Sequence, residues 1–176
     1  MAGFLMSTTG ARVLMCSSVF AFATAAHAQP ALEQLTGKVV GVSDGDTLTV
    51  LVQRDQSLEQ IKVRVSGIDA PEKAQAFGNR SKQGLSDCAF AKQVQVEVIK
   101  LDRYGRSVAK VISQGTDCGL RQIELGLAWH YKAYAREQSS VDRQSYAAAE
   151  NLAHEQKLGL WSDPAAIPPW EFRHPK

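Results

Sequence analysis

The chain has 176 residues, with 20 Lys and Arg against 18 Asp and Glu, so its formal net charge is +2 at pH 7. Such a balanced total argues against a histone-like protein that binds polyanions through overall charge, but it is compatible with a local basic patch. The length suits one domain with a hydrophobic core.

Residues 1–28 have the features of a cleavable signal peptide. Arg12 is the only charged residue among them, a mostly apolar run follows it, and small residues precede a cleavage point between Ala28 and Gln29. The apolar run is short for a membrane span, so an uncleaved anchor is the less favoured alternative. We therefore expect a single mature domain over 29–176 that is periplasmic or secreted.

The mature chain keeps two cysteines, Cys88 and Cys118. Disulfides persist outside the cytoplasm and two cysteines allow one pairing, so a Cys88–Cys118 disulfide is predicted, with two buried free thiols as the alternative. The sequence has no C-x-x-C or clustered Cys/His motif, which argues against a zinc site.

Three strands in quick succession are predicted at the start of this domain. Residues 37–52 contain two β-branched runs around a Ser-Asp-Gly-Asp turn, the pattern of a hairpin. In residues 60–66 the apolar Ile61, Val63 and Val65 alternate with polar residues, as in a half-buried strand. Short consecutive strands favour an antiparallel meander.

A helix and two further strands are predicted next. Residues 79–92 contain one glycine and are most simply a helix. Residues 94–99 alternate in polarity, the turn at 101–106 contains a glycine, and residues 107–112 return as a strand.

Two helices and a tail complete the chain. Apolar residues at helical spacing from Leu120 to Leu127 predict the second helix, and residues 141–157 predict the third. The Pro- and Trp-rich residues 162–176 are expected to form an irregular tail over a core spanning 37–161. Three tryptophans are expected to anchor the core or this tail: Trp129, Trp161 and Trp170. Together these elements predict an α+β fold, a five-stranded antiparallel OB-fold β-barrel with three α-helices.

Charged side chains recur where the predicted strands end. Asp46 lies in the first turn, Asp69 and Glu72 follow the strand that carries Arg64, and Arg106 closes the "DRYGR" turn. This set suits phosphodiester hydrolysis, in which a cation and guanidinium groups neutralise phosphate oxygens and a carboxylate takes a proton from water. Oxygen ligands without Cys or His point to Ca²⁺ before zinc.

Each motif taken alone has a structural explanation. Asp44-Gly45 is a common hairpin turn, Arg64 is an ordinary solvent-facing strand residue, and "DRYGR" is a turn in which glycine adopts a positive φ. An EF-hand is excluded because Leu48 and Asp55 stand where two of its ligands would be required. Only the conjunction of the motifs favours catalysis.

Five segments together resemble the thermonuclease (staphylococcal nuclease-like) family. They are "VSDGDTLTV", "VRVSGIDAPE", "DRYGR", "ELGLAWHYKAY" and "KLGLW", and they extend from about Gly37 to Trp161. The resemblance implies an OB-fold barrel with three helices. It also implies Ca²⁺-dependent hydrolysis of DNA and RNA that leaves 3′-phosphate ends.

The resemblance implies a set of Ca²⁺ ligands. Asp46 and Asp69 would bind through their carboxylates and Ala70 through its main-chain carbonyl, with Asp44 just outside the ligands. Ala70 stands where the best-known member of the family has threonine, which leaves the carbonyl in place.

The resemblance implies roles for the remaining site residues. Glu72 would be the general base or would orient the attacking water, while Arg64 and Arg106 would bind the scissile phosphate. Three further residues are less firmly implied as substrate contacts: Tyr104, Lys132 and Tyr134.

The expected partners are DNA and RNA, preferably single-stranded or frayed, bound with little sequence specificity. A local basic rim is expected from residues in or beside the motifs: Lys62, Arg64, Lys73, Arg80, Lys82, Arg103, Arg106, Lys132 and Arg136. We expect a monomer without a stable protein partner. The alternative is a non-catalytic OB-fold nucleic-acid-binding module, which loss of a ligand or arginine would indicate, but this sequence retains them all.

Overall fold

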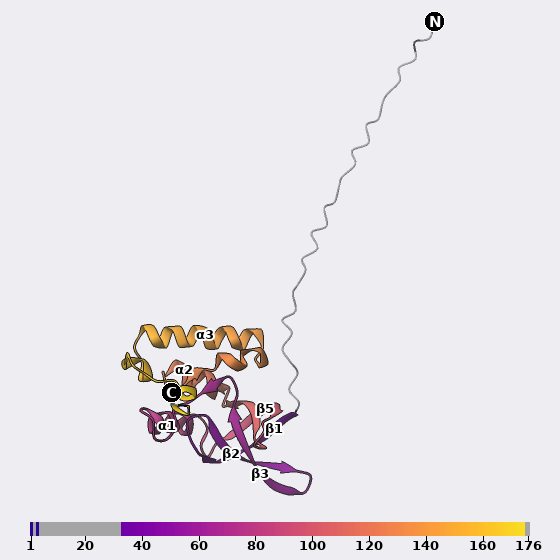
Figure 1. Cartoon of the computed structure of the whole chain (residues 1–176). Coiled ribbons are helices and arrows are strands. Elements are labelled where there is room, and N and C mark those ends of the chain that lie inside the picture. Colours follow the sequence, from indigo (N-terminus) through magenta and orange to yellow (C-terminus); the bar gives the residue numbers. More distant parts are fainter. Residues whose placement is uncertain (2, 4–32, 175–176) are drawn as a thin grey trace.

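The computed structural model describes residues 1, 3 and 33–174. Apart from residues 1 and 3, the signal peptide predicted over 1–28 lies outside the described residues. Five long strands form a barrel: β1 (Glu33–Val42), β2 (Thr47–Arg54), β3 (Ser57–Val65), β5 (Gln93–Leu101) and β6 (Ser107–Ser113) (Figure 1). The predicted α+β fold with a five-stranded barrel is therefore confirmed.

The barrel is mixed, whereas a wholly antiparallel one was predicted. Its strands follow the order β3-β2-β1-β5-β6, and β3 and β6 close the barrel as a parallel pair, with Arg64 opposite Val108. Antiparallel neighbours alternate in direction, so the first and last of five strands run the same way. An odd number of strands therefore makes one parallel pairing unavoidable.

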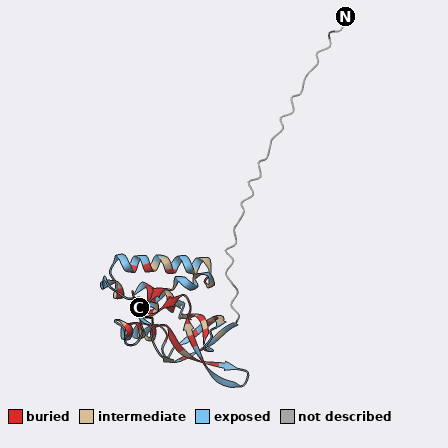
Figure 2. Cartoon of the chain, viewed as in Figure 1, coloured by how far each residue is buried: buried red, intermediate tan, exposed pale blue. Residues whose placement is uncertain are grey.

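The interior is filled by the apolar sides of these strands. Ile61, Val63 and Val65 are all buried, as the alternation predicted, and valines on β1, β2 and β5 meet them. Figure 2 shows that buried residues gather between the barrel and the helices, while the tip of the β2–β3 hairpin is exposed.

The three predicted helices are present as α1 (Gly78–Ala89), α2 (Cys118–Glu124) and α3 (Ser140–Glu155), with α2 between α3 and the barrel (Figure 1). Two of them begin at side-chain caps, since Asp117 accepts hydrogen bonds from the first turn of α2 and Ser139 from that of α3. In the described part of the chain, no helix is long and apolar enough to cross a membrane.

Several short strands and a 3₁₀ turn were not predicted from the sequence. Two of them, β4 (Ile68–Asp69) and β8 (Trp129–His130), pair as a separate antiparallel ladder, and β7 (Thr116–Asp117) pairs antiparallel with the end of β6. Two-residue strands contain no alternation from which to predict them. A 3₁₀ turn, η1 (Lys132–Glu137), follows β8.

The C-terminal tail is more ordered than the irregular segment that was expected. It begins where a 3₁₀ helix, η2 (Gly159–Ser162), ends, and it contains a short helix, α4 (Pro169–Phe172), in which proline takes the first position. Figure 1 shows that the last described residues, in yellow, lie close to α1 and α2. The expectation of an irregular tail was therefore wrong in part.

The predicted disulfide is confirmed. Cys88 near the end of α1 is bonded to Cys118 at the start of α2, with the two Cα atoms 5.9 Å apart. The bond therefore ties together the two helices that carry part of the site described below.

Removing this bond is expected to destabilise the fold without changing the chemistry. It closes a loop spanning 30 residues, and the chain-entropy model for such a loop gives about 3–4 kcal/mol. Urea unfolding of the Cys88→Ser/Cys118→Ser variant should show a lower midpoint than the oxidised parent, and the reduced parent should resemble the variant. Equal midpoints for all three proteins would contradict a stabilising role.

Tyr146 gives the fold a predictable response to alkali. Its buried hydroxyl donates to the Asp117 carboxylate at 3.0 Å, and burial together with that carboxylate raises its pKa well above 10. The stabilisation is complete below pH 10, the pKa in the unfolded chain, and is lost as pH rises toward the folded value. Tyr146→Phe should cost about 0.5–1.5 kcal/mol at pH 7, and its stability should fall less steeply above pH 10. A steeper fall in urea-unfolding experiments would show the sign to be wrong.

Candidate active site

The turn between β1 and β2 holds Asp46 at one end of the barrel. Asp44 accepts a hydrogen bond from the Asp46 main-chain N–H at 3.1 Å, and the Asp46 carbonyl accepts one from Val65 at 2.7 Å. Gly45 packs so closely on α1 that a Cβ there would lie 1.9 Å from the Ser81 hydroxyl. The turn is thus fixed from both sides.

Gln122 of α2 clamps the same turn and was missed by the sequence analysis. Its side-chain amide donates to the Gly45 carbonyl at 2.8 Å and to the Ser81 carbonyl at 2.9 Å, and the residue is buried. A glutamine within a helical pattern gives no sequence signal of such a contact.

Asp46 is a buried acid with several neighbours. Its carboxylate accepts hydrogen bonds from the Thr47 hydroxyl at 2.8 Å and the Ala70 main-chain N–H at 3.2 Å. Burial, reinforced by the charges of Asp44 and Asp69, outweighs the attraction of Arg64 and raises the pKa of Asp46 to about 7. This carboxylate therefore lacks full compensation for the cost of burying its charge.

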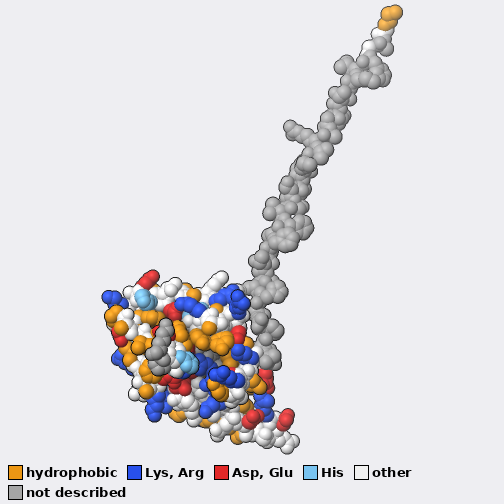
Figure 3. Space-filling model, in the orientation of Figure 1, with side chains coloured by type: hydrophobic (Ala, Val, Ile, Leu, Met, Phe, Trp, Pro, Cys, Tyr) orange, Lys and Arg blue, Asp and Glu red, His pale blue; other side chains and the backbone are white. Residues whose placement is uncertain are grey.

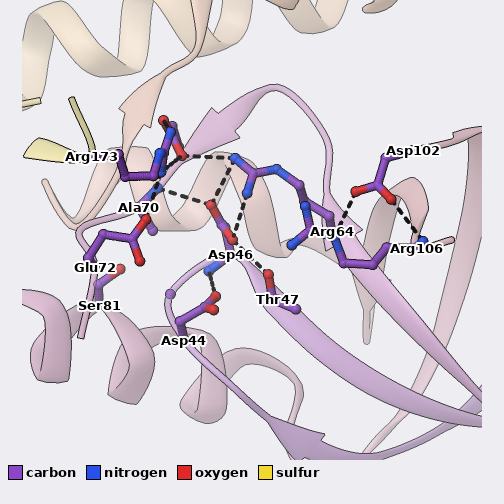
Figure 4. Close-up of polar contacts among 12 residues, drawn as sticks. Asp44, Asp46, Thr47, Arg64, Ala70, Glu72, Ser81, Asp102, Arg106 and Arg173 are labelled. Carbon is purple, nitrogen blue, oxygen red and sulfur yellow. Dashed lines mark hydrogen bonds and ion pairs between the residues drawn. The ribbon is translucent and has the colours of Figure 1, made fainter. Parts of the chain in front are cut away.

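Arg64 joins the two buried carboxylates. Its Nη2 atom lies 3.2 Å from Asp46 and 2.8 Å from Asp69, which the β4–β8 ladder holds with none of its side chain exposed (Figure 4). Burial alone would lower the pKa of Arg64, but the two carboxylates outweigh it and raise that pKa. The guanidinium is therefore charged and held in one position.

Glu72 lies at the mouth of this cluster in the loop after β4. Its side chain is 40% exposed, and its main-chain N–H donates to the Gln75 side chain at 3.2 Å. The start of α1 fixes the loop, because a Cβ on Gly78 would lie 2.1 Å from the Glu72 carbonyl oxygen. Glu72 thus combines a fixed backbone with a carboxylate that solvent can reach.

Arg106 lies beside Arg64 on the barrel rim (Figure 4). Asp102 accepts hydrogen bonds from its Nε at 2.7 Å and its main-chain N–H at 2.9 Å. Burial opposes ionisation of Asp102, but these hydrogen bonds outweigh it and lower the pKa of the carboxyl group. Tyr104 in the same turn is 68% exposed, and the Arg106 guanidinium lies 5.5 Å from its ring centre.

The other predicted substrate contacts lie in η1. Lys132 forms an ion pair with Glu150 of α3, and Tyr134 lies under the ammonium of Lys100, 4.6 Å from its ring centre. Within the described part of the chain, neither side chain is hydrogen-bonded or ion-paired with Asp46, Arg64, Asp69 or Glu72.

Arg173 of the C-terminal tail belongs to the cluster, although the sequence analysis assigned it no role. Its guanidinium lies 2.7 Å from both Asp69 and Glu72. Its hydrogen bonds to Asp69, and to a lesser degree those to Glu72, raise its pKa despite partial burial.

A pocket of about 660 Å³ is lined by both residues of β8, Trp129 and His130. Trp129, Trp161 and Trp170 line it, and both of the latter rings pack edge-on against Trp129. These contacts agree with the prediction that the tryptophans anchor the core and the tail. On the face shown in Figure 3, Lys and Arg side chains are scattered among apolar and acidic ones and form no continuous band.

The donor chemistry of the cluster fits a hard divalent cation. Asp46 and Asp69 converge on one guanidinium nitrogen, and the raised pKa of Asp46 marks a buried carboxylate that a further positive charge would stabilise. Among the described residues, no three Asp, Glu, His or Cys side chains are grouped as a complete metal site. Further ligands would therefore come from the main chain, such as the Ala70 carbonyl, or from water.

Comparison with known proteins identifies relatives that match most of the chain. Residues 62–163 match the family model described as staphylococcal nuclease homologue. The chain is 41% identical to a micrococcal nuclease of Shigella flexneri, over 82% of this chain and 83% of the relative. It is 41% identical to an uncharacterized endonuclease of Haemophilus influenzae, over 80% and 74%. Protein ParB of Escherichia coli is 36% identical, over 90% of each chain.

Proposed function

The chain belongs to the staphylococcal nuclease homologue family and is a nuclease, a hydrolase of phosphodiester bonds, and we propose that it is an exported, Ca²⁺-dependent and largely non-specific endonuclease. We propose that it cleaves DNA and RNA and leaves 3′-phosphate ends. One observation carries this proposal: Asp46, Asp69, Arg64 and the accessible Glu72 lie in one cluster at the barrel end.

Asp46, Asp69 and the Ala70 carbonyl would hold the Ca²⁺ ion. When bound, the ion would neutralise charge on the phosphate and orient a water molecule. The buried position of both carboxylates strengthens their interaction with a cation, because less water screens it. Asp44 adds negative charge next to these ligands.

Arg64 and Arg106 would bind the scissile phosphate. A guanidinium donates two parallel hydrogen bonds to phosphate oxygens, and these strengthen as charge builds up in the transition state. Arg64 is held by Asp46 and Asp69, and Arg106 by Asp102, so both side chains are oriented before substrate arrives.

Glu72 would accept a proton from the attacking water or orient that water. Its carboxylate is the most exposed of the three, with 40% of its side chain accessible against 6% for Asp46 and none for Asp69. A group that exchanges protons with water needs this access, whereas a metal ligand does not.

The substrate would be single-stranded or frayed nucleic acid, because the cluster has to surround one phosphate. Tyr104 and Tyr134 are both exposed and could stack on bases, while Lys132 could contact the backbone. The disulfide supports an extracytoplasmic location after cleavage near Ala28 and Gln29. We propose a monomer without a stable protein partner.

The proposal is tested by incubating the purified chain with single-stranded DNA or RNA, with Ca²⁺ or with a chelator. We expect cleavage in Ca²⁺ alone, and products that a polymerase extends only after phosphatase treatment. Salt-sensitive binding without cleavage in any divalent cation would support the binding-module alternative. Cleavage in the chelator, or directly extendable ends, would contradict the proposed cofactor or product.

A further inference from the structure

We propose that Arg173 is a resident counter-ion of the catalytic carboxylates and competes with the divalent cation for them, so that the C-terminal tail sets the cation concentration the enzyme requires. This inference rests on the proposed Ca²⁺ site. The residues matched by the family model end at 163, so Arg173 lies outside the matched region.

The contacts place one positive charge between two functional acids. Arg173 Nη2 lies 2.7 Å from Asp69 Oδ2, and Nη1 lies 2.7 Å from Glu72 Oε1 and 3.3 Å from Asp69 Oδ1. Figure 4 shows Arg173 on one side of Asp46 and Arg64 on the other. Asp69 therefore already has a guanidinium partner on each of its two oxygens.

The tail is anchored so that it delivers this guanidinium to one place. Trp170 stacks on Tyr131, with ring centres 5.4 Å apart, and packs edge-on against Trp129. Trp129 is the register partner of Asp69 in the β4–β8 ladder. The Gln75 side chain also donates a hydrogen bond to the Ile167 carbonyl. The tail thus attaches to the same ladder and loop that carry its two acidic partners.

The contact between Arg173 and Asp69 is easier for a cation to displace than the contact between Arg64 and Asp69. Arg173 is 35% exposed and follows the four-residue helix α4, whereas Arg64 is 20% exposed and belongs to a barrel strand. A divalent cation bound to Asp69 would repel the nearby guanidinium and reduce its attraction to that carboxylate. Arg173 would therefore give way before Arg64 does.

Release of Arg173 would also free Glu72. Arg173 Nη1 occupies one carboxylate oxygen of Glu72 at 2.7 Å, so a water molecule cannot hydrogen-bond to that oxygen from the same side while the contact persists. Binding of the cation would thus release Glu72 in the same step. Until the cation binds, Arg173 would keep Glu72 engaged and the site inactive.

The experiment is Ca²⁺ titration of the full chain by calorimetry, comparing the parent with Arg173→Ala and Arg173→Lys. The matched control is Arg121→Ala, which breaks a surface ion pair with Glu124 on α2. We expect Arg173→Ala to lower the Kd for Ca²⁺ by roughly 5- to 150-fold, the usual range of coupling between two sites. Arg173→Lys should be intermediate and Arg121→Ala unchanged.

A second readout is tryptophan fluorescence, since displacement of the tail changes the surroundings of Trp170. The parent should show a Ca²⁺-dependent change that Trp170→Phe removes. An unchanged or higher Kd in Arg173→Ala would overturn the inference.

DNA hydrolysis at saturating Ca²⁺ is measured in parallel. Hydrolysis with an unchanged Kd would refute only the role of Arg173, whereas no hydrolysis by any of the proteins would refute the proposed function.

Discussion

Replacing Glu72 with glutamine is expected to slow DNA hydrolysis by roughly 10²- to 10⁴-fold, the contribution typical of a positioned general base. Glutamine keeps the size of the side chain but accepts protons poorly. Since Glu72 is 40% exposed, the substitution should leave the urea midpoint nearly unchanged. The measurement is kcat at saturating Ca²⁺ and substrate, with Glu155→Gln as a control on the exposed face of α3.

The same variant separates the two roles proposed for Glu72. If Glu72 takes the proton, the residual rate of Glu72→Gln should rise with hydroxide concentration, because bulk base then replaces it. If it only orients water, the pH profile should keep its shape at a lower level. Full activity in Glu72→Gln would remove Glu72 from the mechanism and would count against the assignment of the whole cluster.

The barrel could be predicted because its strands carry a local signal. Val63 and Val65 are buried because they alternate with polar residues that face away from the core, and this period of two is visible in the sequence. The charged residues of the candidate site could also be predicted from the sequence, because Asp46, Arg64, Asp69 and Glu72 lie in short motifs at strand ends. Their convergence followed from closure of the barrel.

The remaining parts depend on contacts between distant residues. The ladder that fixes Asp69 pairs it with Trp129, and the turn that fixes Asp46 is held by Gln122, 77 residues from the carbonyl of Gly45. No local pattern reports such pairs. Arg173 escaped for the same reason, because it lies 104 residues from Asp69 in a segment whose composition indicates only an irregular tail.

Replacing Arg64 with lysine is expected to reduce kcat by roughly 10²- to 10³-fold, the loss seen when one preorganised transition-state donor is removed. Lysine keeps the charge but cannot donate two parallel hydrogen bonds to a phosphate. Arg64→Lys should therefore remain folded, since its ammonium can still pair with one of the two acids, Asp46 or Asp69. The control is Arg54→Lys, an exposed arginine on β2 that pairs with Glu33 and Glu59.

Arg64→Ala should differ from Arg64→Lys in stability as well as in rate. Without the guanidinium, Asp46 and Asp69 are two buried acids with one fewer compensating charge, and breaking a buried ion pair costs about 3–5 kcal/mol. Asp69 keeps Arg173, so the lower end of that range is expected in urea unfolding. Added Ca²⁺ should restore part of the loss, because the cation would neutralise the same two carboxylates.

A large fall in kcat with stability restored by Ca²⁺ would identify Arg64 as both a phosphate ligand and the counter-ion of the metal site. Equal stability of Arg64→Ala and the parent would mean that these carboxylates do not depend on Arg64 for their burial.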